Sequence, residues 1–122
     1  MESMTSKVLI GTSGWGYEEW IGPFYPKGLT SKDFLPYYSK IFYTNEINTT
    51  FYNIPSEWVV RSWVKRTPLD FLFTVKIPQV ITHDSKLDID ECSDDLDYFL
   101  GVMDPLIKSN KLLVEKILHP LG

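Results

Sequence analysis

Short strand-like segments alternate with helix-like segments along most of this chain of 122 residues. The clearest strand is the run FLFTVKI at 71–77, which Pro78 ends. The segment before it, 57–66, has a helical pattern, and Ser56 is a candidate N-cap for it. Strands that alternate with helices at this spacing predict βαβ units and a parallel sheet. We therefore expect an α/β protein. The apolar residues of the 57–66 helix that are predicted to face inward are Val59, Val60, Trp63 and Val64.

The N-terminal part of the chain adds another strand and another helix to this pattern. Residues 8–10 are apolar and are predicted to form a short strand that runs into small residues. A helix is predicted over 30–42, with Thr30 and Asp33 as a capping pair at its start. Proline is unfavourable inside a helix, so the regular helix is predicted to begin near Pro36.

Two segments complete the pattern. Residues 44–50, TNEINTT, are predicted to form a polar strand because of their β-branched content. The last helix is predicted to be capped by Ser93, and a further strand begins at 111–113. With no repeat or linker in the chain, residues 1–122 are predicted to form a single domain. The apolar positions that recur at helical spacing in the last helix are Leu96, Phe99, Leu100, Met103 and Ile107.

Charge and cysteine content limit the classes of partner and compartment. The net charge is −4 and the sequence pI is about 5.1, which argues against a nucleic acid as partner. No long apolar stretch predicts a membrane span or a signal peptide. A single cysteine, Cys92, excludes an internal disulfide and is typical of a reducing compartment. We expect a cytoplasmic protein that does not associate with membranes.

Alternation along the strands predicts which side chains face away from the helices. In 71–77 the apolar set that begins at Phe71 is expected under the helices, so Thr74 and Lys76 point the other way. In 44–50 Ile47 is expected under the helices. The residues of 44–50 that then share a direction with Lys76 are Glu46, Asn48 and Thr50.

Glu46 and Lys76 are therefore predicted to enter the same space from neighbouring strands. A lysine in a dry interior needs a partner, and Glu46 is the acid in these strands that is placed to serve. One interpretation is a structural ion pair that satisfies two buried groups. The other is a substrate site with a positioned acid or base. The sequence favours neither interpretation.

The segments after the strands contain further candidate site residues, because ligands bind at the carboxyl ends of strands in parallel α/β folds. Aromatic residues are frequent there, and His83 follows the third strand. GTSGWG has neither the spacing of a dinucleotide-binding loop nor the lysine of a P-loop. With His83 and His119 as the two histidines and one cysteine, no metal site is predicted, and no cofactor is indicated.

Four segments taken together resemble the YecE-like family, which is catalogued as domain of unknown function seventy-two. They are IGTSGWGYEEWIGPFYP (10–26), EINTTFYNIPS (46–56), the W-x-x-x-TP pattern (63–68) and FLFTVKIPQVITH (71–83). The resemblance extends over about residues 8–112. It implies a TIM-barrel-like (β/α) fold and, for the family, no established activity. It also implies a cleft at the positions matched by Trp15, Tyr17, Glu46, Asn48, Phe51, Tyr52, Lys76 and His83.

The chain departs from the family pattern at its end. Family members continue from the last helix into a strand that ends in QLPPS, whereas residues 111–113 begin that strand and the ending is missing. A complete (β/α)₈ barrel needs about 250 residues. We therefore expect the N-terminal portion of a TIM-barrel-like fold, with about three βα units and a partial fourth strand, in a truncated or frameshifted chain.

Two classes of function remain open. The first is an enzyme, or the first half of one, that binds a small polar or phosphorylated ligand. Glu46 would act as acid or base, Lys76 as an electrostatic clamp and His83 as a second proton-transfer or anion-binding group. The residues expected to bind substrate beside them are Trp15, Tyr17, Asn48, Phe51 and Tyr52. The second class is a non-catalytic assembly module that self-associates through open half-barrel edges, or an inactive product.

Overall fold

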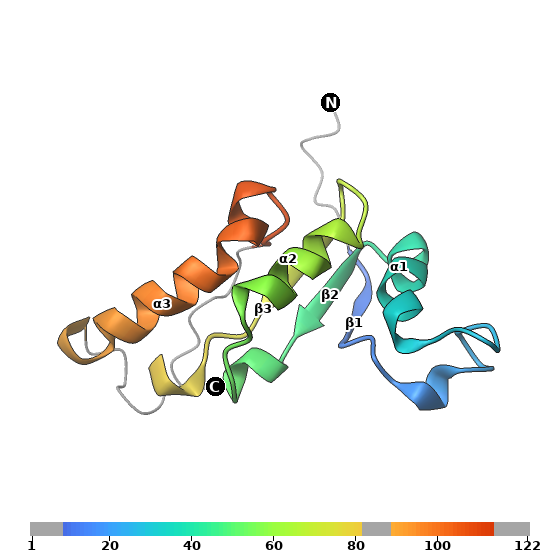
Figure 1. Cartoon of the computed structure of the whole chain (residues 1–122), viewed down its shortest axis with the longest axis horizontal. Helices are drawn as coiled ribbons and strands as arrows, with labels where there is room; N and C mark the ends of the chain where they lie inside the picture. Colours follow the sequence, from blue (N-terminus) through green and yellow to red (C-terminus); the bar gives the residue numbers. More distant parts are fainter. Residues whose placement is uncertain (1–8, 82–88, 114–122) are drawn as a thin grey trace.

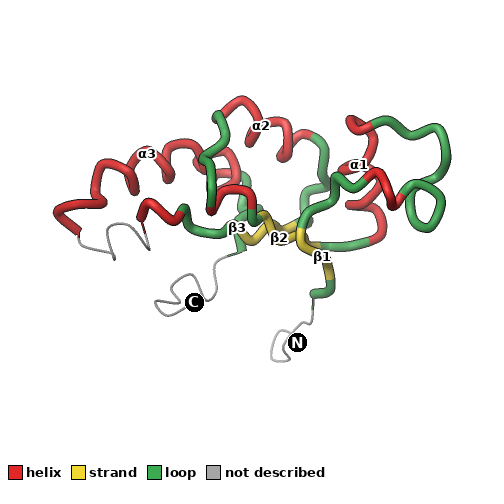
Figure 2. The backbone as a smooth tube through the Cα atoms, turned by 90° about the horizontal axis from the view of Figure 1, so that it is seen from below, coloured by secondary structure: helices red, strands yellow, loops and turns green. Residues whose placement is uncertain are grey.

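The computed structural model describes residues 9–81 and 89–113, with no side chains described for 89–92. Three short parallel strands form one sheet in the order β1-β2-β3. Figure 1 shows the strands alternating with helices along the chain. In Figure 2, α1, α2 and α3 lie on one side of the sheet. The elements are β1 (Gly11–Ser13), η2 (Glu18–Trp20), α1 (Ser31–Ile41), β2 (Thr44–Ile47), η3 (Thr49–Phe51), α2 (Glu57–Lys65), β3 (Leu72–Val75) and α3 (Ile89–Lys108).

The outer side of β3 pairs with the segment that follows α3. The Phe73 N–H donates to the Lys111 carbonyl at 2.7 Å, and the Leu113 N–H donates to the Phe73 carbonyl at 2.7 Å. Phe73 and Leu112 form a parallel bridge, so residues 111–113 take the direction of a further strand. The prediction of a parallel α/β sheet is confirmed with three strands, and the isolated bridge at Leu112 falls within 111–113, where a further strand was predicted to begin.

The first two strands differ in position from their predictions. β1 lies at Gly11–Ser13, in the small residues that follow the predicted segment, because glycine allows the backbones of β1 and β2 to approach. A Cβ atom on Gly11 would lie 2.0 Å from the Thr44 carbonyl oxygen. β2 ends at Ile47, since residues 49–51 turn into η3. Thr50 is consequently buried, with its hydroxyl donating to the Lys76 carbonyl at 2.6 Å, and the prediction that it shares the direction of Glu46 is wrong.

Helix α1 begins at Ser31, so the prediction that Pro36 delays its start is wrong. The capping pair is confirmed: the Asp33 carboxylate accepts from both the N–H and the hydroxyl of Thr30, each at 3.0 Å. These hydrogen bonds hold the pKa of Asp33 below its usual value. Pro36 removes only one backbone donor, and the capped first turn stabilises the helix in spite of that loss.

The ends and inner faces of α2 and α3 follow the sequence pattern in part. The Ser56 hydroxyl accepts from the Val59 N–H at 3.3 Å, which confirms the predicted cap of α2. Val59 itself is 39% exposed, so its predicted inward position is wrong. α3 begins at Ile89, before the predicted cap at Ser93. Leu100 and Ile107 are exposed, whereas the buried residues among the described side chains of α3 are Phe99, Val102, Met103 and Leu106.

The core lies between the sheet and the helices and is rich in aromatic rings. Phe71 and Phe73 are fully buried there, which confirms the predicted helix-facing side of this strand segment. Tyr25 stacks on Phe34 with ring centroids 4.3 Å apart. No helix in the described part of the chain is long and apolar enough to cross a membrane.

Candidate functional site

The face of the sheet opposite the helices borders a hollow of about 700 Å³. From β2 it is lined by Thr44 and Glu46, and from β3 by Leu72 and Thr74. The sequence predicted this orientation for Glu46 and Thr74 from strand alternation. We call this side the open face. Its remaining lining residues are Leu9, Gly11, Thr12, Ser13 and Leu113.

Polar groups from two strands meet where β1 and β2 end. The Gly14 N–H donates to the Glu46 carbonyl at 2.9 Å, which continues the pairing of the two strands. The Asn48 amide donates to the Ser13 hydroxyl, while the Asn48 Oδ1 atom is buried and has no hydrogen-bond partner. We call this end of the sheet, formed by Ser13, Gly14, Glu46, Asn48 and Lys76, the carboxyl edge.

A network of hydrogen bonds fixes the peptide at Gly14, which is part of the carboxyl edge. The Gly14 carbonyl accepts from the Thr12 hydroxyl at 2.8 Å and from the Asn45 amide at 2.7 Å. The Tyr38 hydroxyl of α1 accepts from the Thr12 N–H at 2.7 Å and donates to the Thr44 carbonyl at 3.1 Å. It therefore bridges β1 and β2, and it ties the carboxyl edge to the helical layer.

The sequence reasoning missed Thr12, Asn45 and Tyr38. Asn45 is 1% exposed, and alternation with Ile47 would have placed it under the helices. A buried amide needs hydrogen-bond partners, and this requirement could have indicated from the sequence that Asn45 belongs to a polar network.

Glu46 and Lys76 do not pair. Both side chains are exposed, and neither takes part in the ion pairs found among the described residues, which are Arg61–Glu57 and Lys108–Asp104. Lys76 Nζ instead lies 5.2 Å from the centroid of the Phe51 ring, in the geometry of a cation–π contact. The interpretation as a structural ion pair is therefore wrong, since η3 brings Phe51 to the lysine and neither charge is buried.

The other predicted site residues differ in their surroundings. Trp15 packs into the core, with its ring centroid 5.9 Å from that of Trp63. The Tyr17 hydroxyl donates to the Ser13 carbonyl at 2.8 Å, at the carboxyl edge. Tyr52 is 74% exposed, and its ring lies edge-on to Phe51. His83 lies outside the described residues.

Among the described residues the buried lysine is Lys111, and not Lys76 as predicted from the strand pattern. Its ammonium group donates to the carbonyls of Thr67 and Pro68, and burial lowers its pKa while the Asp70 charge opposes that shift. Lys111 is far in sequence from its acceptors Thr67 and Pro68. The local sequence pattern therefore does not distinguish it from a lysine on the surface. Among the side chains that the structure describes, in 9–81 and 93–113, no group of His, Cys, Asp and Glu is arranged to hold a metal ion.

Together these features define an α/β protein with helices on one face of a parallel sheet and a polar cluster at its carboxyl edge. The family model described as "Protein of unknown function DUF72" matches residues 9–116. The chain therefore belongs to the DUF72 family, and the resemblance inferred from its four sequence segments is confirmed.

The relatives are longer proteins. UPF0759 protein YecE of Escherichia coli K12 is 35% identical over 99 residues, which cover 81% of this chain and 33% of that protein. UPF0759 protein YunF of Bacillus subtilis is 35% identical over 107 residues, 86% of this chain and 37% of YunF. This chain thus spans about a third of the length of these relatives.

Solved structures of the family match the same fold. A DUF72 family protein from Thermotoga maritima superposes with a TM-score of 0.70 at 36% identity, over 86% of this chain and 41% of that chain. A DUF72 family protein from Enterococcus faecalis gives a TM-score of 0.58 at 30% identity, over 66% of this chain and 33% of that chain. The helices and the parallel sheet described above match part of the family structures.

Proposed function

We propose that the sheet is the N-terminal portion of a TIM-barrel-like (β/α) fold whose carboxyl edge binds a small polar or phosphorylated ligand. The parallel order β1-β2-β3, the further pairing at Leu112 and the helices on one face support this architecture. In such folds the open face is the barrel interior, and ligands bind at the carboxyl ends of the strands. In the relatives, which are about three times as long, the further residues would complete the barrel.

The observation that carries the proposal is the hydrogen bond between Asn48 and Ser13, together with Glu46, which is the register partner of Ser13 and lines the open face. It gathers polar groups from two strands at the end of the sheet where parallel folds bind ligands. Glu46 is an exposed carboxylate that can accept a proton or a hydrogen bond from the ligand.

The side chains around this pair take supporting roles in the proposal. Lys76 is exposed beside Phe51, and its ammonium group can attract an anionic group of the ligand. Tyr17 and Tyr52 would form walls, whereas Trp15 belongs to the core and is left out of the site. The second proton-transfer or anion-binding role is proposed for His83.

Two probes test the proposal: glucose 6-phosphate, which carries hydroxyl groups and a phosphate, and glucose, which lacks the phosphate. Each is titrated into the ¹⁵N-labelled full chain, and amide shifts are followed by NMR. We expect shifts concentrated at Ser13, Glu46 and Asn48. Glu46→Gln and Lys76→Met weaken the binding, while Glu19→Gln and Lys27→Met, at exposed positions outside the carboxyl edge, leave it unchanged. Absence of shifts with both probes, or shifts that persist in both site variants, would overturn the proposal.

The edges of the sheet favour a second candidate function, assembly with another copy of the chain. In the described sheet β1 pairs with β2 alone, and Ile10 beside it is 67% exposed. An unpaired strand edge is a template for pairing, and two copies together would supply the strands that one lacks. Light scattering tests this: Ile10→Lys should convert a two-chain species into single chains, and a single-chain mass for the wild type would exclude it.

A further inference from the structure

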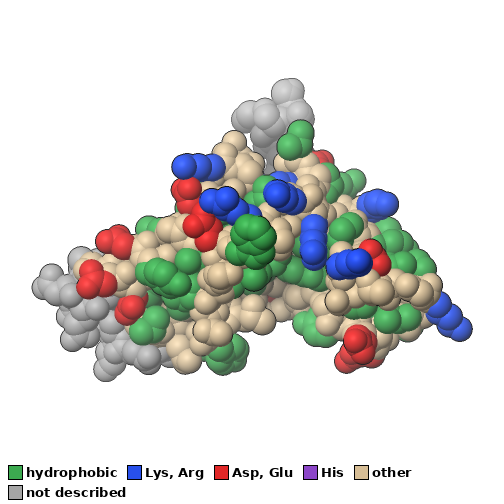
Figure 3. All heavy atoms as spheres, in the orientation of Figure 1, with side chains coloured by type: hydrophobic (Ala, Val, Ile, Leu, Met, Phe, Trp, Pro, Cys, Tyr) green, Lys and Arg blue, Asp and Glu red, His purple; other side chains and the backbone are tan. Residues whose placement is uncertain are grey.

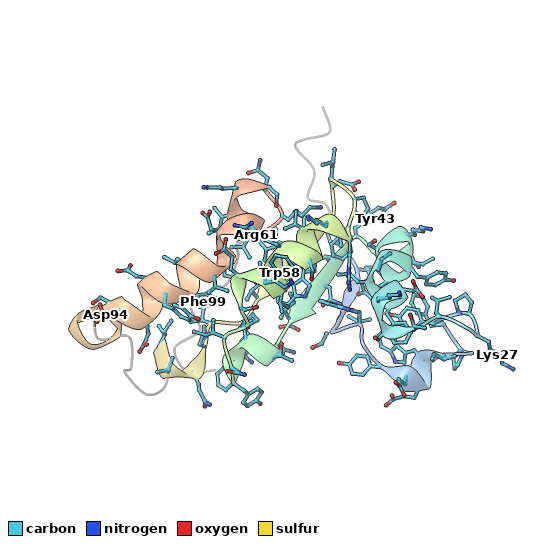
Figure 4. The ribbon with its side chains drawn as sticks, in the orientation of Figure 1. Lys27, Tyr43, Trp58, Arg61, Asp94 and Phe99 are labelled. Atoms are coloured by element: carbon cyan, nitrogen blue, oxygen red, sulfur yellow. The ribbon has the colours of Figure 1, made fainter. Side chains whose placement is uncertain are left out.

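The segment that joins β1 to η2 continues from the carboxyl edge, and we call its residues 14–17 the β1 loop. It includes the end of GTSGWG, a motif that has neither the lysine of a P-loop nor the spacing of a dinucleotide-binding loop. In Figure 4, Tyr43 marks the amino end of β2, so this loop lies at the opposite, carboxyl end of the parallel strands. Loops at that end contact the ligands of parallel α/β folds. The backbone of the β1 loop therefore borders the proposed ligand.

Two successive carbonyl groups of the β1 loop are held by buried side chains. The Gly14 carbonyl accepts from the Asn45 amide at 2.7 Å, and the Trp15 carbonyl accepts from the Tyr25 hydroxyl at 2.6 Å. Tyr25 is fully buried in the core, and Asn45 is buried on the side of β2 that faces the helices. The Trp15 ring packs there as well, with its centroid 6.1 Å from that of Phe73. These contacts fix the orientation of two neighbouring peptide groups.

The N–H groups of the same two peptides point the other way. No peptide bond in the described part of the chain is cis, and in a trans peptide the N–H is directed opposite to the carbonyl. The Gly14 carbonyl shares its peptide with the Trp15 N–H, and the Trp15 carbonyl shares its peptide with the Gly16 N–H. Both N–H groups are therefore directed away from the buried side chains that hold the carbonyls. Among the described residues, neither N–H group has a hydrogen-bond partner.

Glycine at position 14 makes this arrangement of the backbone possible. Gly14 has a φ of +77°, which side chains rarely allow, and a Cβ atom on it would lie 2.6 Å from the Tyr17 hydroxyl oxygen. Successive backbone N–H groups beside a residue of positive φ form the concave sites, called nests, in which proteins bind anions. The β1 loop thus presents two adjacent donors whose direction is set before any ligand binds.

The charged side chains of the described residues leave both N–H groups open. The carboxylates of Glu18, Glu19 and Glu46 accept no hydrogen bond from them. Figure 3 shows Lys and Arg side chains over α1 and α2, on the outer side of the helical layer. Lys76 follows β3 and is separated from the β1 loop by β2, so it attracts an anion through space. Direct contact with an anion at this loop therefore depends on the two peptide N–H groups.

We propose that the N–H groups of Trp15 and Gly16 together bind the anionic group of the ligand, which in a phosphorylated ligand is the phosphate. The place of the ligand comes from the proposed function, so this inference rests on it. Only the backbone of Trp15 takes part, because its ring lies in the core. Asn45 and Tyr25 are positioning residues, since they fix the two carbonyls and thereby aim the donors. Donors that are fixed before binding lose little conformational freedom when the ligand arrives, which strengthens the contact.

Three probes separate this inference from the proposed function: inorganic phosphate, glucose 6-phosphate and glucose, each titrated into the ¹⁵N-labelled full chain at constant ionic strength. We expect the amide proton signals of Trp15 and Gly16 to move downfield with both phosphates and not with glucose, because a hydrogen bond to an anion deshields the donor proton. Shifts at Glu46 and Asn48 with Trp15 and Gly16 unmoved would support the proposed function and overturn this inference. No response to any probe would overturn both.

Gly16→Pro and Gly16→Ala are a matched pair, because proline removes the N–H and alanine keeps it. The φ of Gly16 is not positive, and no atom lies within 4 Å of a Cβ placed on it. We expect Gly16→Ala to bind inorganic phosphate as the wild type does, and Gly16→Pro to raise the Kd by about tenfold, as expected for the loss of a hydrogen bond to a charged group. Equal Kd values in the two variants, with folding checked by circular dichroism, would overturn the inference.

Tyr25→Phe tests the positioning role and keeps the buried ring. The variant releases the Trp15 carbonyl, so the Gly16 N–H is no longer held in one direction. We expect the Kd for inorganic phosphate and for glucose 6-phosphate to rise, while the Kd for glucose stays unchanged. A purely structural effect would weaken the binding of glucose as well. Tyr37→Phe is the control, because this half-buried ring packs against Tyr25. An unchanged Kd for phosphate in Tyr25→Phe would contradict the role of the fixed carbonyl.

Discussion

Among the described glycines, Gly11 leaves the least room for a side chain, because β1 and β2 approach each other there. A Cβ atom there would lie 2.0 Å from the Thr44 carbonyl oxygen and 2.8 Å from its carbon, both backbone atoms that cannot move aside. Gly11→Ala is therefore expected to lower the free energy of unfolding by about 1–3 kcal/mol. Urea denaturation measures the loss. Gly16→Ala is the control, since no atom lies within 4 Å of its Cβ, and an equal loss in both variants would contradict the steric argument.

The Tyr38 hydroxyl carries a second prediction at the residue scale, because it links β1, β2 and α1. Tyr38→Phe leaves the Thr12 N–H and the Thr44 carbonyl without this partner, and each lies in a half-buried residue. We expect a loss of about 1–3 kcal/mol in unfolding free energy. The NMR signal of the Ser13 amide should shift as well, because the strand end loses its anchor. Tyr43→Phe, at a 59% exposed position, should change neither quantity.

At the scale of elements, Lys111 attaches the end of α3 to the loop between α2 and β3. Burial lowers its pKa below the ordinary value of 10.5. Between the folded-state pKa and 10.5, the unfolded chain binds more protons than the native chain, so this group makes stability rise with pH in that window. Burial of Tyr25 raises the pKa of its hydroxyl, and this acts in the opposite direction above pH 10.0.

Lys111→Met separates the two effects, because the variant keeps Tyr25. In the variant, the carbonyls of Thr67 and Pro68 lose their donor at every pH, which lowers the unfolding free energy by a constant amount. The remaining difference in unfolding free energy from wild type depends on pH, because only the wild type has the lysine that titrates. We expect the wild-type unfolding free energy minus that of Lys111→Met to rise with pH up to 10.5. Urea titrations from neutral to alkaline pH measure the difference, and Lys108→Met controls for the loss of a surface lysine. A difference that stays constant over this range would contradict the assignment.

The elements also show how far local patterns determine the fold. The order of strands and helices followed from periodicity, and so did the burial of Phe71 and Phe73 under the helices. The observed ends of the strands differ from the predicted ends where contacts between residues distant in sequence determine them. β1 begins at Gly11 because the chain meets Thr44 there, and η3 ends β2 because the Thr50 hydroxyl bonds to the Lys76 carbonyl. No local pattern contains these contacts.

The same distinction holds for the candidate site. Alternation placed Glu46 on the open face, and the proximity of strand ends brought Asn48 to β1. The expected contact between Glu46 and Lys76 required Lys76 to continue β3, but that strand ends at Val75. Lys76 then lies against Phe51, whose position depends on the turn of η3. Side chains beyond a strand end follow the turn and not the alternation of the strand.

At the scale of the whole molecule, one continuous core joins the α1 side to the α3 side. It runs from Tyr25 and Phe34, along the helix-covered face of the sheet, to Met103 and Leu106. Phe73 lies at its centre: it is fully buried, and its ring contacts those of Trp15, Trp63 and Phe71. Its backbone also pairs with residues 111–113. Stability on both sides of the molecule is therefore expected to depend on this residue.

Phe73→Ala should lower the free energy of unfolding by about 3–5 kcal/mol, because it removes a buried ring and leaves a cavity between helices and sheet. A shared core also predicts one cooperative transition. Far-UV circular dichroism, which follows the helices, and tryptophan fluorescence, which follows the rings packed near Phe73, should then give the same midpoint in wild type and variant. Tyr52→Ala, at a 74% exposed ring, should change stability little. Separate midpoints for the two signals would mean that the helices unfold independently of the sheet, and the carboxyl edge would then lack the rigid support that a binding site on this sheet requires.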